Sequence, residues 1–114
     1  MNQDRRGFRF SCNAAGEVAA ESSPKATIAV RATELSLHGC YLETPAPFPA
    51  ETPVVVKIFH AEEYFEAKGT VIYVKATLGM GLMFRDMNPY CRGILQKWIL
   101  AALHNQFEAQ SATE

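Results

Sequence analysis

Long apolar runs, a secretory signal and paired cysteines are all missing from this 114-residue sequence. No hydrophobic run approaches the roughly 20 residues that a bilayer-spanning helix needs. Residues 1–10 (MNQDRRGFRF) lack the apolar stretch of a secretory signal. We therefore expect a cytoplasmic protein with no transmembrane segment. The three cysteines, Cys12, Cys40 and Cys91, are odd in number and far apart, and the three histidines are equally scattered. This spacing predicts neither a disulfide framework nor a metal site.

Excess positive charge is also missing, because 11 lysines and arginines oppose 12 aspartates and glutamates, for a net charge of −1. A long nucleic acid requires many cationic contacts, so this balance argues against a nucleic-acid polymer as the partner. The charge is nevertheless uneven. Arg5, Arg6 and Arg9 lie close together near the start, and residues 62–66 are acidic. A local basic cluster on a near-neutral chain favours a small anionic ligand.

Several short segments with a two-residue apolar period, divided by turn residues, indicate an antiparallel sheet. After a first short strand close to Arg9, the expected strands span residues 26–32, 39–43, 54–60, 64–75 and 80–84. Residues 16–24 (GEVAAESSP) predict a turn or loop, and residues 45–53, with four prolines, predict a connecting loop. Because no crossover helix separates the strands, antiparallel pairing follows. A small sheet of this kind loses its edges best by closing into a barrel.

Alternation is regular over residues 64–75, where five residues are expected to share one face of the strand. They are Phe65, Ala67, Gly69, Val71 and Tyr73. A glycine in the interior of a strand, such as Gly69, predicts a bulge or a sharp bend.

The end of the chain predicts a helix. Asn88 suits the N-cap and Pro89 the first helical position. The apolar stripe that we expect to cover the barrel is formed by Cys91, Ile94, Leu95, Trp98 and Ala102. A second set, Leu100, Leu103 and Phe107, points roughly the opposite way. These residues are either scattered exposed apolar side chains, which are normal, or a contact face for a homodimer or a partner protein.

A polar corner at residues 34–39 (ELSLHG) joins two of the expected strands. Glu34 offers only acceptors, which suits the N–H edge of a base, and Ser36 offers a donor and acceptors. Gly39 permits a positive φ or the close approach of a ligand to the backbone. Arginine pairs with phosphates or with the O6/N7 edge of guanine. Two arginines four residues apart, Arg5 and Arg9, therefore suit the phosphate and base parts of a nucleotide.

These segments resemble the two sequence motifs of PilZ domains. DRRGFRF (4–10) resembles the RxxxR motif, with Arg5 and Arg9 in the arginine positions. ELSLHG resembles the (D/N)xSxxG motif, with Ser36 and Gly39 matching and Glu34 in place of the usual Asp or Asn. The resemblance continues through CYLETPAPFP (40–49), EAKGTVIYV (66–74) and GMGLMF (79–84) into the terminal helix. It covers the chain roughly from residue 5 to residue 103.

The resemblance implies a six-stranded antiparallel β-barrel with a C-terminal α-helix that acts in bacteria as a receptor for cyclic di-GMP. In this family an arginine arm wraps over the dinucleotide, usually an intercalated dimer, and the second motif contacts the guanine edge. The implied ligand-binding residues are Arg5, Arg6, Arg9, Glu34, Ser36 and Gly39. No catalytic residue, metal or cofactor other than this ligand is implied. The implied organisation is an arginine-bearing arm (1–12), a single PilZ-like domain (8–110) and a disordered tail (111–114).

The leading interpretation is a receptor that relays the level of cyclic di-GMP to an unknown protein partner controlling motility, pili or exopolysaccharide. The alternative is a PilZ-like interaction adaptor that does not bind the nucleotide. The extra methylene of Glu34 moves its carboxylate by about one C–C bond length, which can misplace a hydrogen bond in a fixed site. We expect binding to be retained, with any loss of affinity arising at this position.

Two further possibilities carry less weight. Cys40 and His38 lie two residues apart and could form a nucleophile and base, but Cys40 falls on the expected inward face of its strand. A small barrel that binds RNA or single-stranded DNA would need a basic groove with exposed aromatic residues. The net charge and the acidic 62–66 segment argue against such a groove.

Overall fold

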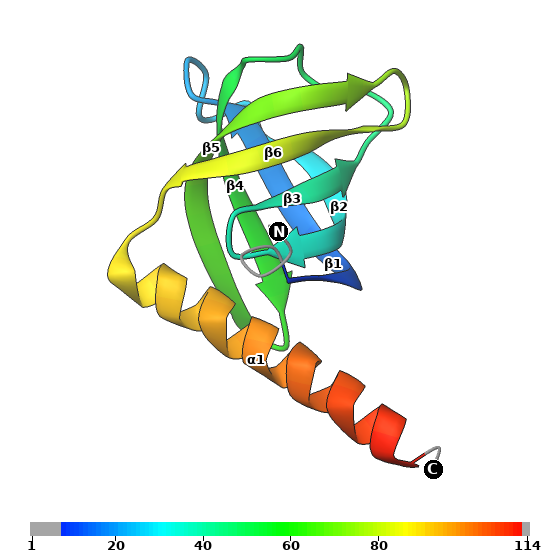
Figure 1. Cartoon of the computed structure of the whole chain (residues 1–114). Coiled ribbons are helices and arrows are strands. Elements are labelled where there is room, and N and C mark those ends of the chain that lie inside the picture. Colours follow the sequence, from blue (N-terminus) through cyan, green and yellow to red (C-terminus); the bar gives the residue numbers. More distant parts are fainter. Residues whose placement is uncertain (1–7, 113–114) are drawn as a thin grey trace, which may run out of the picture.

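The computed structural model describes the backbone of residues 8–112 and the side chains of residues 8–105. Within this range the chain forms a closed barrel followed by one helix (Figure 1). The elements are β1 (Arg9–Ala20), β2 (Ile28–Ser36), β3 (Gly39–Glu43), β4 (Pro53–His60), β5 (Glu63–Lys75), β6 (Gly79–Asp86) and α1 (Pro89–Ala112). The expected six-stranded antiparallel barrel with a C-terminal helix is therefore confirmed.

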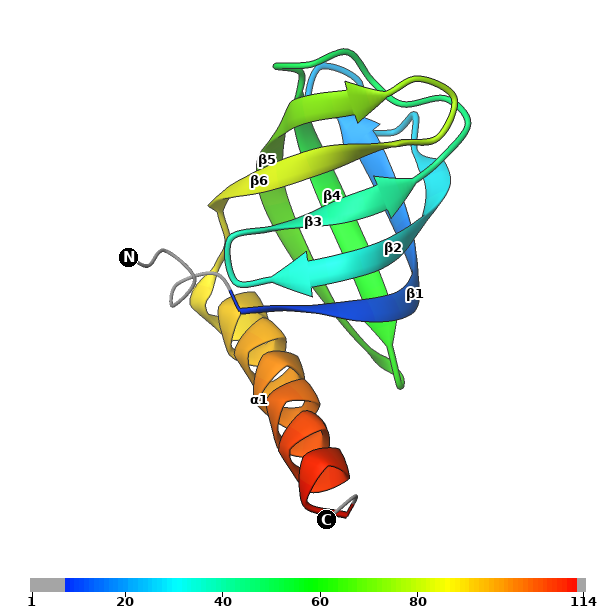
Figure 2. The same cartoon turned by 45° about the vertical axis from the view of Figure 1, so that its right-hand side comes forward.

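Closure of the barrel depends on two pairings between strands that are distant in the sequence. β3 pairs with β6 and β1 pairs with β4, which gives the closed order β1-β2-β3-β6-β5-β4. Every pair is antiparallel. Figure 2 shows β1, β2, β3 and β6 side by side on the wall of the barrel that carries the candidate site.

Inward-facing side chains fill the barrel. Phe65, Leu42 and Ile58 are fully buried among other apolar side chains from all six strands. The expectation for residues 39–43 is confirmed, because Cys40 and Leu42 face inward from β3. A small barrel is filled in this way by its own side chains and encloses no channel.

The loop expected at residues 16–24 is wrong in its first half. β1 continues to Ala20, and Gly16 pairs with Val30 of β2 on one side and with Ile58 of β4 on the other. Glycine and alanine disfavour strands on propensity alone. Here the hydrogen-bonding positions offered by two neighbouring strands override that preference, and Val18 is fully buried between them.

The expected face of Tyr73 is also wrong. The register of β5 against β6 shifts between Val71 and Tyr73, where Ile72 is the extra residue. Such a bulge re-aims the side chains that follow it. Tyr73 is consequently 44% exposed and Ile72 51% exposed, although Val71 is fully buried. A second irregularity, between Lys68 and Gly69, confirms the break expected at Gly69.

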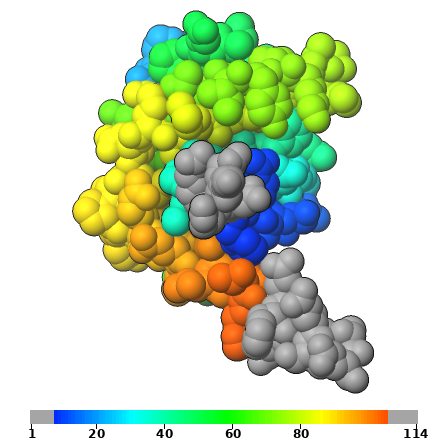
Figure 3. All heavy atoms as spheres, in the orientation of Figure 1, coloured from blue at the N-terminus to red at the C-terminus, as the bar shows by residue number. Residues whose placement is uncertain are grey.

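The helix begins as its sequence predicts. The side-chain oxygen of Asn88 accepts the backbone N–H of Cys91 at 2.8 Å, and Pro89 is the first helical residue. The expected apolar stripe of the helix packs against the barrel. Its members Cys91, Ile94, Leu95 and Trp98 are buried, and Ala102 is partly buried. Figure 3 shows this first part of the helix, in orange, directly against the barrel. Within the described residues, no helix combines the length and hydropathy needed to cross a bilayer.

The second half of α1 projects beyond the barrel (Figures 1 and 2). Leu100 is 65% exposed and Leu103 is 44% exposed. The backbone at Phe107 is helical, but its side chain lies outside the described residues.

One carboxylate at the start of β5 ties the helix to the barrel. Glu63 accepts a hydrogen bond from Lys97 Nζ at 2.5 Å and one from the indole Nε1–H of Trp98 at 3.1 Å. The hydrogen bond from Lys97, followed by that from Trp98, lowers the pKa of Glu63 below its ordinary value of 4.5. Both bonds favour the ionised form of the carboxyl group.

The tie at Glu63 predicts an acid-sensitive contribution to stability. Because the folded state has the lower pKa, the contribution is present above pH 4.5 and is lost as the pH falls through the folded-state value. We expect Glu63→Gln to lower the urea midpoint of unfolding at neutral pH. On acidification, the midpoint of Glu63→Gln should fall by less than that of the unsubstituted protein. The control is Glu62→Gln, because Glu62 has no ion pair or side-chain hydrogen bond within the described structure. Equal acid sensitivity in the two variants would contradict the assignment.

Candidate functional site

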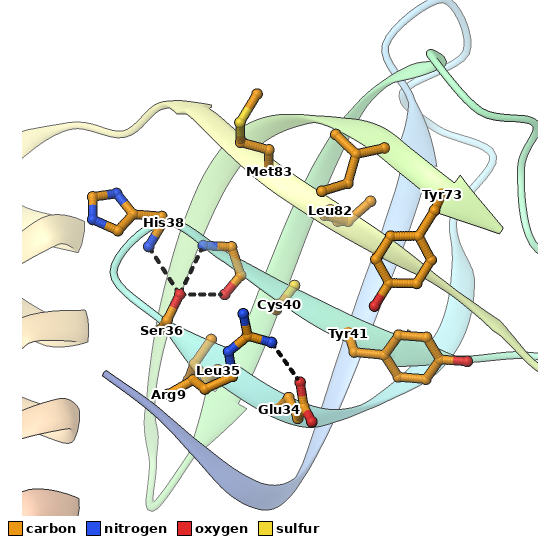
Figure 4. A pocket seen from close by; sticks show the side chains of 13 residues that line it. Arg9, Glu34, Leu35, Ser36, His38, Cys40, Tyr41, Tyr73, Leu82 and Met83 are labelled. Atoms are coloured by element: carbon orange, nitrogen blue, oxygen red, sulfur yellow. Dashed lines mark hydrogen bonds and ion pairs between the residues drawn. The ribbon is translucent and has the colours of Figure 1, made fainter. Parts of the chain in front are cut away.

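A hollow of about 220 Å³ lies on the outer wall of the barrel, beside the β2–β3 turn (Figure 4). Its lining comes from β1, β2, β3, β5 and β6. One rim is polar and carries Arg9, Glu34 and Ser36. The opposite rim carries Tyr73 and Met83.

The polar rim brings together residues that are far apart in the sequence. Antiparallel pairing of β1 with β2 places Arg9 opposite Ser36 and Ser11 opposite Glu34. Arg9 and Glu34 are thus diagonal neighbours on one face, and Arg9 Nη1 lies 3.3 Å from Glu34 Oε1. Both side chains remain largely exposed, at 66% and 48%. Arg5 and Arg6, the other predicted arginines, lie outside the described residues.

Glu34 reaches this rim because β2 breaks its alternation. The strict period that places Ala32 in the core would also turn Glu34 inward. Instead the ladder of β2 against β3 shifts register between Ala32 and Glu34, and Leu35 is the next buried residue. The shift turns the carboxylate outward, on the side of the sheet where Arg9 lies.

Ser36 has a structural task in the β2–β3 turn. Its hydroxyl oxygen accepts the backbone N–H of His38 at 3.1 Å and that of Gly39 at 3.2 Å, and its O–H donates to the Gly39 carbonyl at 3.4 Å. A serine that bonds to nearby backbone in this way stabilises a turn. Figure 4 shows these three bonds converging on the one oxygen.

Gly39 is required by the close approach of β6. A Cβ on Gly39 would lie 2.1 Å from the carbonyl oxygen of Leu82, a distance that no side chain tolerates. The positive φ allowed by the sequence is not used, since no glycine within the described residues has one. The absence of a side chain at this position therefore serves the β3–β6 pairing directly.

The less favoured alternative, in which Cys40 and His38 form a nucleophile and base, is not supported by the environment of Cys40. Cys40 is only 8% exposed, and burial raises the pKa of its thiol, so it stays protonated near neutral pH. Burial, and then the charge of Glu34, also raise the pKa of Cys12. No group of three or more metal-ligating side chains occurs within the described part of the chain.

The apolar rim was missed from the sequence. Ile72, Tyr73 and Met83 line the hollow and are 51%, 44% and 48% exposed. The ring of Tyr73 stacks with that of Tyr41, with centroids 6.2 Å apart and planes 20° apart. Strict alternation places Tyr73 on the same face as Phe65 and Val71, and only the bulge at Ile72 reveals its position. No residue type in the segment marks that bulge.

The described residues thus form a closed six-stranded antiparallel barrel with a C-terminal helix, and an outer hollow unites residues from β1 and β2. The sequence matches the PilZ domain family over residues 3–101. The chain therefore belongs to the PilZ domain family. No curated protein matches the chain significantly in sequence.

Several solved structures share the fold. YcgR from Escherichia coli, in complex with c-di-GMP, gives a TM-score of 0.77 at 18% identity, with coverage of 98% of this chain and 51% of that chain. The inhibitor of motility MotI/DgrA from Bacillus subtilis gives 0.75 at 13% identity, covering 91% of this chain and 53% of that chain. The PilZ domain of CeSA from a cellulose-synthesising bacterium gives 0.65 at 18% identity, covering 85% and 99%. The chain thus spans about half the length of MotI/DgrA and of YcgR.

The bonds of Ser36 predict a loss of stability without any ligand. Ser36→Ala leaves two backbone N–H groups without their acceptor, and we expect it to destabilise the protein by about 1 kcal/mol in urea unfolding. Ser22→Ala, in the β1–β2 connection, is the control, because the Ser22 side chain makes no hydrogen bond within the described residues. If Ser36→Ala unfolds at the same urea concentration as the unsubstituted protein, the hydroxyl is not needed by the turn.

Proposed function

We propose that this chain binds cyclic di-GMP in the hollow and relays the level of this second messenger to a partner protein. The observation that supports the proposal best is the meeting of Arg9 and Glu34 at one rim, although 25 residues separate them. Membership of the PilZ family supports it as well. A YcgR structure of the same fold is described as a complex with c-di-GMP.

Each polar residue has a proposed role. Arg9 supplies a planar, permanently charged fork for a phosphate or for the O6/N7 edge of guanine. Glu34 accepts from the N–H edge of guanine. Ser36 and Gly39 act through the shape of the turn, and Arg5 and Arg6 add further positive charge. No metal or additional cofactor takes part in this recognition.

Signal output is proposed to pass through protein contacts. The projecting half of α1 exposes Leu100 and Leu103 and is the proposed contact surface, either for a homodimer that also uses Phe107 or for the partner. Light scattering, which counts the subunits in solution, separates these two uses. Control of motility, pili or exopolysaccharide in the bacterial cytoplasm is the proposed setting. The fold shared with MotI/DgrA, an inhibitor of motility, and with the PilZ domain of CeSA from a cellulose-synthesising bacterium supports it.

A second candidate function is an interaction adaptor that does not bind the nucleotide. The ion pair between Arg9 and Glu34 favours it, because each group already has a partner without ligand. The Ser36 bonds and the Gly39 contact are compatible with it too, since both serve the fold. Binding experiments separate the two candidates.

Charge reversal at Arg9 tests the receptor function. We expect isothermal titration calorimetry to show binding of cyclic di-GMP to the unsubstituted protein and no detectable binding to Arg9→Glu, because a carboxylate would repel the phosphates. Arg92→Glu makes the same charge change on an exposed position of α1 and should bind normally. Absence of heat with the unsubstituted protein would favour the adaptor. Equal binding by Arg9→Glu would remove Arg9 from the site.

Shortening Glu34 tests the competition between the ion pair and the ligand. An exposed ion pair contributes at most about 1 kcal/mol, which is about fivefold in affinity. Glu34→Asp keeps the acceptor and withdraws it from Arg9, so we expect binding to tighten by up to about fivefold. Glu34→Gln, which keeps the length and removes the charge, controls for the loss of the pair alone. Weaker binding by Glu34→Asp would contradict the competition.

A further inference from the structure

The outer faces of three neighbouring strands form a row in which two tyrosines flank a glycine. Tyr41 of β3 pairs with Gly81 of β6, and Gly81 pairs with Tyr73 of β5. The two rings meet across this bare position, with centroids 6.2 Å apart. A Cβ on Gly81 would lie 2.3 Å from the ring of Tyr73, so the absence of a side chain at Gly81 permits the observed ring position.

The bulge at Ile72 adds to this row. It turns Ile72 and Tyr73 outward together, beside the outward-facing Met83, and all three line the hollow that holds Arg9 and Glu34. Each of the three is more than 40% exposed. Large apolar side chains gathered in the wall of a hollow, and not scattered singly, mark a binding surface.

The composition of the hollow indicates more than phosphate recognition. Among the described residues that line it, Arg9 is the one lysine or arginine. A site for phosphate alone would be lined by cations and backbone N–H groups. Here an acceptor and a charged fork lie at one rim, and a flat aromatic ring with two apolar neighbours, Ile72 and Met83, lies at the other. This combination suits a ligand that has both an anionic group and a planar heteroaromatic base.

We infer that Tyr73, with Ile72 and Met83 beside it, is the surface against which one face of a purine base of the ligand packs. The inference rests on the proposed function and identifies a specificity-determining residue of the same hollow. It divides recognition into a charged part at Arg9, which salt screens, and a stacking part at Tyr73, which salt leaves largely unchanged. Tyr73 is held for this contact by the bulge and by the missing side chain at Gly81.

The test is calorimetric titration of the full chain with cyclic di-GMP at low and at high salt. Removing one stacking aromatic lowers affinity by about 5- to 150-fold. We expect a loss in this range for Tyr73→Ala, by the same factor at both salt concentrations. Tyr73→Phe keeps the ring and should recover the affinity. Gly81→Ala keeps the tyrosine but displaces its ring, and should also weaken binding.

Tyr64→Ala is the matched control, because Tyr64 lies on the same strand, is 47% exposed and does not line the hollow. The urea midpoint of each variant shows whether it is folded. If the unsubstituted protein binds and Tyr73→Ala binds equally well, the inference is overturned and the proposed function stands. A Tyr73→Ala loss that Tyr73→Phe does not recover also overturns it. If the unsubstituted protein does not bind, the proposed function and the inference both fail.

Discussion

Successive side chains along a barrel strand point alternately into the core and out to solvent. Because the barrel is closed, every strand is paired on both sides, and this pairing holds the strands in register. A shift of one residue in register would exchange every inward residue of a strand for its polar neighbours. In this protein the alternation holds along most of the barrel and packs Phe65, Leu42 and Ile58 in its centre. Several register shifts interrupt the ladders, and two of these interruptions border the hollow: one in β2 between Ala32 and Glu34, and one in β5 between Val71 and Tyr73.

These two interruptions produce the two rims of the hollow. The first turns Glu34 outward to meet Arg9, and the second turns Tyr73 outward to stack with Tyr41. Neither register shift requires a loop insertion, and the adjoining core residues, Leu35 and Val71, remain buried. Bulges next to functional sites commonly re-aim side chains in this manner. The barrel wall thereby holds charged and aromatic groups around one hollow at fixed positions.

The predictable part of the fold follows from local chemistry. The predicted alternation in residues 39–43 is correct, and so is the predicted helix start, with Asn88 as the N-cap and Pro89 as the first helical residue. Each of these predictions depends on only a few neighbouring residues. The continuation of β1 through Gly16 was not predictable, because the two strands that pair with it come later in the chain. The outward turn of Tyr73 was not predictable for the same kind of reason. A bulge is a property of the ladder between two strands, and a single segment does not encode it visibly.

The candidate site was predictable in its residue types but not in their roles. Ser36 and Gly39 match the motif, yet the bonds of Ser36 close a turn and Gly39 admits the β6 backbone. In this barrel both residues keep these structural tasks whether or not a nucleotide binds. Their presence in the sequence is therefore weak support for binding.

Stronger support for nucleotide binding comes from the side chains that contribute least to the stability of the fold. Arg9 and Glu34 are largely exposed, and an ion pair between exposed groups stabilises a protein little. Tyr73 is an exposed ring on a barrel whose core is complete without it, and its position requires both a bulge and a glycine opposite. Departures from local rules that bring no stability are expected at functional sites. The case for a nucleotide ligand therefore depends less on the serine and glycine of the motif than on the charged and aromatic rims that the two strand irregularities create.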